Sequence, residues 1–166
     1  MLRRQPPLTY ENALSRMAAL CAKCEQCTPD LLKKMSSLGV SAGVAAKVIS
    51  RLIELKFVDD RRFSKAYAHD KLHFSGWGRR KIRQGLWAKR LPPDIIESAC
   101  DDFEDEEYSA IALRVIASKI RSMKECPLSR ESKIKVIRYA MQRGFEYPLI
   151  ADLMRNYKPD SDDSWQ

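Results

Sequence analysis

Glycine and proline are scarce in this chain, with six and eight among 166 residues, and they fall mainly at the boundaries of apolar segments. The chain has no sustained alternation of apolar and polar residues, so the pattern of a half-buried strand is missing. Apolar residues instead recur at every third and fourth position, as they do on one face of a helix. The sequence therefore predicts an all-α protein.

Long apolar runs are missing as well. No stretch reaches the roughly eighteen apolar residues that a membrane-spanning helix needs. The opening segment, MLRRQPPLTY, contains arginines with no apolar core behind them, which is not the pattern of a secretory signal peptide. Together with an odd number of cysteines, five, these absences favour a protein of the reducing cytoplasm with free thiols and no membrane contact.

Catalytic and cofactor motifs are also absent. The sequence shows no Ser/His/Asp or Cys/His arrangement and no glycine-rich loop that could hold a phosphate group. His69 and His73 are one helical turn apart, but they lack a third ligand nearby and the glutamate of an HExxH motif. We therefore expect neither an enzyme nor a cofactor.

Three cysteines form a C-x2-C-x2-C pattern, which is half of an iron–sulfur signature: Cys21, Cys24 and Cys27. A cluster would need a fourth thiolate, and Cys100 and Cys126 are distant in sequence. Cysteines near the end of a helix also serve as small apolar residues. The three are weak metal candidates, and a cluster or redox protein is an alternative that a metal analysis of the purified protein would test.

Positive charge is what the chain has in excess, with a net charge of +8. Residues 101–107 (DDFEDEE) and the C-terminal tail are acidic, whereas the middle of the chain is strongly basic. A Gly-Trp-Gly break at residues 76–78 precedes an expected helix over 79–89, and six cations with no anion lie between Arg79 and Arg90. Such a cluster favours a partner that presents phosphate groups or an acidic protein groove.

The candidate residues for contact with a partner or with nucleic acid lie in this cationic segment: Arg79, Arg80, Lys81, Arg83, Trp87, Lys89 and Arg90. Guanidinium groups can fork onto phosphate or carboxylate oxygens. Trp87 could stack on a base, lie under Arg83 as a cation–π partner, or belong to the core between modules. A merely solvated charged face is the alternative for the whole set.

An internal repeat organises the chain. Three sets of apolar residues share the spacing 4, 5, 4, 4, 4, and they start at Leu31, Ile82 and Val136, at offsets of 51 and 54 residues. This spacing predicts three tandem modules of three helices each, stacked into an elongated and curved body. We expect a flexible leader at 1–8, repeats at 9–57, 58–105 and 106–157, and a disordered acidic tail at 158–166.

Thr28 is the expected N-cap of a helix that contains Leu31.

The central stretch resembles the RecX family, the small cytoplasmic proteins that regulate the bacterial RecA recombinase. The matching residues are Phe57, Val58, Asp59, Asp60, Arg62, Phe63, Gly76, Arg80, Ile82, Arg83, Leu86, Lys89 and Leu91. Within this set, the motif residues Phe57, Asp59, Asp60, Arg62 and Phe63 are expected to hold the module together.

Two positions depart from the family pattern. Gly85 stands where the family tends to have an acid, and it should weaken the helix by up to roughly 1 kcal/mol relative to alanine. Arg90 stands where a glycine ending is usual, so we expect a left-handed backbone there that glycine would accept more easily.

The resemblance implies a regulator that binds in the groove of the RecA–DNA filament and modulates strand exchange and ATP hydrolysis, commonly by inhibition. Its partners would be the RecA filament and, weakly, single- or double-stranded DNA, and it would act as a monomer. The alternative is a helix-turn-helix transcription regulator, because residues 28–55 contain two expected helices with Gly39 in the turn between them. Against it, no strand pair follows to form a wing, and Lys47 and Arg51 alone make a poor recognition face.

Overall fold

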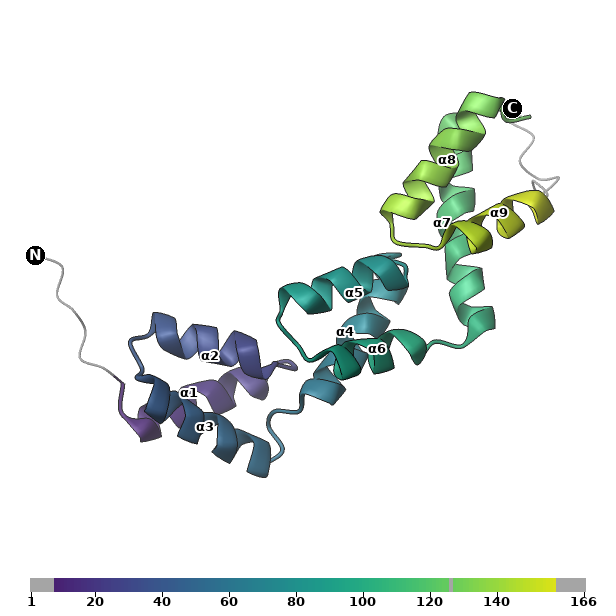
Figure 1. Cartoon of the computed structure of the whole chain (residues 1–166). Helices are drawn as coiled ribbons and strands as arrows, with labels where there is room; N and C mark the ends of the chain where they lie inside the picture. The colour runs from purple at the N-terminus through teal and green to yellow at the C-terminus, as the bar shows by residue number, and fades with distance from the viewer. Residues whose placement is uncertain (1–7, 126, 158–166) are drawn as a thin grey trace, which may run out of the picture. The chain divides into compact units, whose positions relative to one another are not determined.

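The computed structural model describes residues 8–125 and 127–157, which contain nine α-helices and no strand (Figure 1). This confirms the all-α prediction for the described part of the chain. The helices are α1 (Tyr10–Cys21), α2 (Thr28–Ser37), α3 (Ala42–Glu54), α4 (Asp60–His73), α5 (Arg79–Ala88), α6 (Pro93–Asp101), α7 (Asp105–Met123), α8 (Arg130–Gln142) and α9 (Tyr147–Asn156). The expected leader up to residue 7, the expected tail at 158–166 and Cys126 lie outside the described residues.

The predicted repeat is visible in the burial of three consecutive helix triplets, α1–α3, α4–α6 and α7–α9. In each triplet the second helix buries two residues one turn apart, and a third buried residue follows its end. The equivalent buried residues are Leu31, Met35 and Val40, then Ile82, Leu86 and Leu91, then Val136, Ala140 and Phe145. The prediction of tandem three-helix repeats is therefore confirmed.

The backbone closes each of these second helices in the same way. Gly39, Arg90 and Gly144 occupy equivalent repeat positions and have φ angles of 76°, 61° and 97°. The left-handed backbone predicted for Arg90 is thus confirmed. One local conformation ends the second helix of all three triplets.

By contact density the described chain divides into two compact units. Unit 1 holds residues 8–68 and 85–101, and unit 2 holds residues 69–84, 102–125 and 127–157. The division falls inside α4 and inside α5, so the first half of α5 belongs to unit 2 and its second half to unit 1. The predicted elongated and curved body and the predicted repeat boundaries stay predictions.

Helices α1, α2 and α3 of unit 1 pack around one apolar core. Met17, Met35 and Leu52 contribute fully buried side chains from the three helices. The amphipathic spacing that predicted these helices also selected their inward faces.

The N-terminus of α2 is closed by a carboxylate that lies 32 residues away in sequence. The backbone N–H of Thr28 donates to Asp60 Oδ1 at 2.7 Å. Cys27 holds the N-cap position and makes no side-chain cap. The expectation that Thr28 is the N-cap is wrong by one residue, because Thr28 is the first residue of α2 and its own N–H is satisfied by Asp60.

Unit 2 is built on the packing of α7, α8 and α9. Tyr108 and Ile116 of α7, Val136 of α8 and Ile150 of α9 are buried, and the Tyr108 ring centre lies 5.5 Å from that of Phe145. In the part of the chain that the structure describes, none of the helices combines the length and the apolar character needed to cross a bilayer.

Candidate partner-binding surface

Two glycines fix the start of α5 against the turn between α8 and α9 in unit 2. Gly78 N–H donates to Arg143 O at 2.8 Å, and Arg80 N–H donates to Gly144 O at 3.1 Å. A Cβ on Gly78 would lie 2.4 Å from the carbonyl carbon of Gly144, and a Cβ on Gly144 would lie 2.5 Å from Lys81 N. Because only glycine allows two backbones to approach this closely, the first turn of α5 is firmly seated.

A buried hydroxyl closes the same helix end. Arg79 N–H donates to Tyr108 Oη at 2.9 Å, and the Tyr108 O–H donates to Glu146 Oε2 at 2.8 Å. Burial raises the pKa of the Tyr108 phenol. The hydrogen bond from the Arg79 N–H lowers this pKa, and the Glu146 carboxylate raises it further. The N–H groups of residues 78–80 are all used inside the protein, so they are not available to bind an anion.

The side chain of Arg79, one of the predicted contacts, is engaged inside unit 2. Its guanidinium carbon lies 4.0 Å from the Tyr108 ring centre, and Nη2 lies 3.5 Å from Phe103 O and 3.4 Å from Asp105 Oδ1. The side chain is only 22% exposed. Phe103 and Asp105 belong to the acidic segment at 101–107, so this arginine holds that segment to α5.

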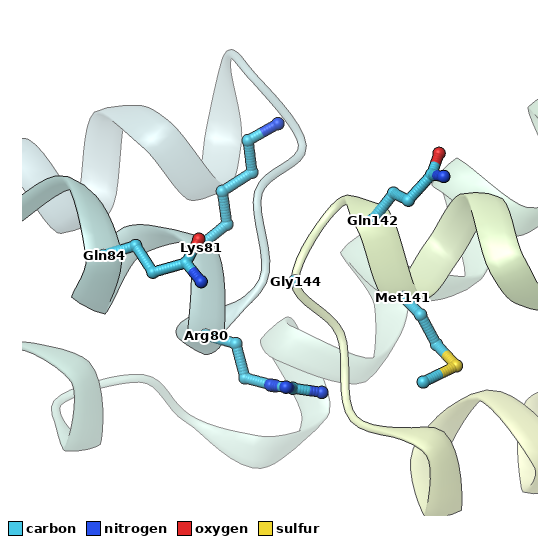
Figure 2. Close-up of a pocket in the computed structure, with 6 residues that line it drawn as sticks. All are labelled: Arg80, Lys81, Gln84, Met141, Gln142 and Gly144. Atoms are coloured by element: carbon cyan, nitrogen blue, oxygen red, sulfur yellow. The ribbon is translucent and has the colours of Figure 1, made fainter.

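Arg80 and Lys81 line an open pocket of unit 2 between α5 and the end of α8. The six lining residues are Arg80, Lys81, Gln84, Met141, Gln142 and Gly144. In Figure 2 the Arg80 side chain extends from α5 toward the α8–α9 turn, while Met141 and Gln142 come from the opposite wall. None of the lining residues is acidic, so the pocket walls do not neutralise their own positive charge.

Trp77 supports the lysine of this pocket. Lys81 Nζ lies 4.7 Å from the Trp77 ring centre, and Lys71 Nζ lies 4.8 Å from it. Ammonium groups are attracted to the face of an indole ring. The tryptophan of the Gly-Trp-Gly break therefore helps to hold Lys81 beside the pocket, a role that the sequence did not indicate.

Helix α8 adds a second cationic surface that sequence reasoning missed. Its exposed cations are Arg130, Lys133, Lys135 and Arg138, against a single acid, Glu131. Ile134 and Met141 lie on the same helix and are 41% and 38% exposed. The four-to-one ratio of cations to acids over residues 130–138 was the available signal.

Lys89, another predicted contact, is engaged in the same way inside unit 1. Its Nζ is 2.5 Å from Asp30 Oδ2 and 5.3 Å from the Phe63 ring centre, and its side chain is 28% exposed. Burial raises the pKa of Asp30, but hydrogen bonds from Lys89 and the Cys27 thiol outweigh it and leave the pKa below its ordinary value. Lys89 directly follows α5, so its charge joins the end of that helix to α2 within the unit.

The remaining candidates of the cationic segment differ in exposure. Trp87 in unit 1 is 50% exposed, so it is not a core residue, and Arg90 is exposed as well. Arg83 in unit 2 is half-buried. For these three residues, contact with a partner stays a prediction.

The motif residues of the family resemblance make contacts inside unit 1. Asp59 Oδ1 accepts two N–H groups from the first turn of α4 at 2.9 and 3.1 Å, and these bonds lower the pKa of Asp59. Arg62 Nε donates to Glu25 Oε1 at 2.7 Å, and its guanidinium also reaches the carbonyl of Phe57 at 3.4 Å. Phe63 is buried. These contacts fix the chain where α3 leads into α4.

The cysteine triplet does not form an assembled site. Cys27 is buried, Cys21 is half-buried and Cys24 is exposed. Burial raises the pKa of the Cys27 thiol to about 11, so its thiolate is disfavoured near neutral pH. Within residues 8–125 and 127–157, no group of three or more His, Cys, Asp or Glu residues could hold a metal ion.

The fold and the surface define a class: an all-α protein of tandem three-helix repeats that presents a cationic surface. Two family models match the chain, the second three-helix domain of RecX at residues 59–99 and the third at residues 105–154. Together they cover more than half of its length. The chain belongs to the RecX family.

Curated relatives agree with this assignment. Regulatory protein RecX of Chlorobaculum tepidum is 28% identical over 144 residues, which are 87% of this chain and 87% of the relative. Regulatory protein RecX of Finegoldia magna is 25% identical over 129 residues, 77% of this chain. The chain spans 63% of the length of that second relative.

Two solved structures show the same fold. The crystal structure of RecX from Lactobacillus salivarius superposes with a TM-score of 0.78 at 17% identity, and it covers 88% of this chain and 94% of the other. A second crystal structure, of a regulatory protein RecX, gives a TM-score of 0.79 at 20% identity over 89% and 72% of the two chains.

Proposed function

We propose that this protein regulates the RecA recombinase by binding in the groove of the RecA–DNA filament, where it inhibits strand exchange and ATP hydrolysis. Membership of the RecX family is the observation that carries this proposal. The cationic surface supports it, because a nucleoprotein groove offers phosphate groups and acidic side chains. The protein would act without catalysis of its own, in the cytoplasm, as a monomer that binds free DNA weakly.

Arg80 and Lys81 are the contacts that we propose for the groove, together with Arg83, Trp87 and Arg90 from the predicted set. We leave Arg79 and Lys89 out of the proposed contacts, because each is engaged in an ion pair inside its own unit, with Asp105 and Asp30. The contacting surface is therefore smaller than the count of cations in the sequence indicated.

The test is RecA-dependent ATP hydrolysis on single-stranded DNA, measured with the variant Arg80→Gln/Lys81→Gln. We expect about tenfold more of this protein to be needed for half-maximal inhibition, because charged contacts to a polyanionic groove are lost. The matched control is Lys33→Gln/Lys34→Gln, which removes two exposed cations from α2 and should inhibit like the wild type. Inhibition of equal potency by both variants would refute the assigned surface, and no effect of the wild type on RecA would refute the function.

A further inference from the structure

The pocket of unit 2 combines cations, amides and an apolar side chain in one fixed frame. Arg80 and Lys81 supply the charge, and Gln84 and Gln142 supply amides that can both donate and accept hydrogen bonds. Met141 supplies an apolar surface that is 38% exposed. The close contact of Gly78 with Gly144 holds both walls together.

The apolar part of this surface continues along α8. Ile134 lies two helical turns before Met141 and is 41% exposed, and the exposed Arg138 lies between them. Methionine and arginine are enriched in the contact surfaces between proteins. Apolar anchors that alternate with a cation along one helix suit a peptide chain with side chains of both kinds.

Two observations weigh against nucleic acid as the occupant of the pocket. The backbone N–H groups at the start of α5 are used internally by Arg143, Tyr108 and Gly144, so the helix end that would favour a phosphate is closed. The exposed side chains of Ile134 and Met141 also gain little from a phosphodiester backbone, because it offers no apolar surface to bury against them.

We infer that this pocket, with the adjoining Ile134–Arg138–Met141 surface of α8, binds a short acidic segment of a protein partner, in which a carboxylate lies next to an apolar side chain. The Arg80 guanidinium forks onto the carboxylate oxygens, the glutamine amides complete their hydrogen bonds, and the apolar neighbour packs on Met141. The inference deepens the proposed function, on which it rests for the identity of the protein that supplies this segment.

The direct test uses the full chain with carbon-13-labelled methionine methyl groups. The probes are a blocked octapeptide of alternating Glu and Leu, the same peptide with Gln in place of Glu, and an oligothymidylate. We expect the Met141 methyl resonance, assigned by its loss in Met141→Ser, to shift with the Glu–Leu peptide and not with the Gln–Leu peptide. A shift with the oligothymidylate alone, or no shift with any probe, would overturn the inference.

Variants of the pocket residues test the inference through the affinity for the peptide. Met141→Ser and Arg80→Gln should each weaken binding of the Glu–Leu peptide by about tenfold, the loss typical of a central contact residue. Leu113→Ser on α7, at 37% exposure, is the matched apolar control, and Arg155→Gln on α9 is the matched charge control. Neither control should change the affinity for the peptide, and equal losses in controls and test variants would contradict a specific pocket.

Co-sedimentation with RecA filaments separates this inference from the proposed function. If the wild type does not sediment with filaments, the proposed function fails. The peptide titration then still decides whether the pocket binds an acidic segment. If the wild type sediments and both pocket variants do so with unchanged affinity while the peptide leaves the Met141 methyl unmoved, the function stands and the pocket is refuted.

Discussion

Arg90 shows how a single residue can be placed against its own conformational preference. The equivalent positions of the other two triplets hold Gly39 and Gly144, and all three have positive φ. A side chain with a Cβ costs roughly 1–2 kcal/mol in this region, whereas glycine does not. The arginine is therefore held in a strained backbone, while its side chain stays exposed.

Replacement of Arg90 by glycine should stabilise the protein. We expect Arg90→Gly to raise the free energy of unfolding by about 1 kcal/mol, because the left-handed strain is relieved. Urea denaturation followed by circular dichroism measures this change. Arg90→Ala is the control, since it removes the same charge and keeps the strain, and it should not stabilise the protein.

Gly85 has a packing reason that the sequence did not reveal. A Cβ at this position would lie 2.3 Å from the hydroxyl oxygen of Tyr67. The close approach of α4 to α5 in unit 1 thus requires a glycine here, and the cost in helix propensity follows from that requirement. A larger residue here would have to displace the tyrosine ring.

At the scale of elements, the turns that end α2 and α8 share one backbone conformation but differ in their surroundings. A Cβ on Gly39 would meet no atom within 4 Å. A Cβ on Gly144 would lie 2.6 Å from the Cβ of Lys81, at the start of α5. The first turn therefore needs glycine for its φ angle alone, and the second needs it for both φ and space.

Alanine substitutions should separate these two requirements. We expect Gly39→Ala to lower the free energy of unfolding by about 1 kcal/mol, from strain alone, and Gly144→Ala to lower it by roughly 3 kcal/mol or more, because overpacking adds to the strain. Gly43→Ala, inside α3 with no neighbour within 4 Å, is the control and should stabilise slightly. Equal losses at positions 39 and 144, again from urea denaturation, would contradict the close contact with α5.

For the whole molecule, the net charge of +8 overstates what a polyanion can contact. Of the six cations between residues 79 and 90, Arg79 and Lys89 are paired with carboxylates in their own units. The other four cations of this segment are the candidates for contact with phosphate groups. The same count limits the electrostatic part of any binding to DNA alone.

The salt dependence of binding to single-stranded DNA should reflect this smaller number. Four contacts give a slope of log K against log salt concentration of about −3, whereas six would give about −4. We expect a slope no steeper than about −3 for an oligothymidylate, measured by fluorescence anisotropy between low and physiological salt. A steeper slope would show that cations outside this segment, such as those of α8, also contact the strand.

The sequence by itself determined the helical class, the three repeats and the left-handed backbone at Arg90. The first two follow from local information, because apolar spacing and turn residues act over a few residues, and the third follows from the family resemblance, in which a glycine is usual at that position. The cationic character of α5 was readable for the same reason, since charge is a property of composition.

Only the tertiary structure decided which of those charges remain at the surface. Lys89 meets Asp30 at a separation of 59 residues, Arg79 meets Asp105 at 26, and Asp60 closes α2 at 32. No local pattern specifies such pairs, because they depend on how helices pack after they form. The pocket beside Met141 has the same origin, since it exists only where the backbones of Gly78 and Gly144 touch.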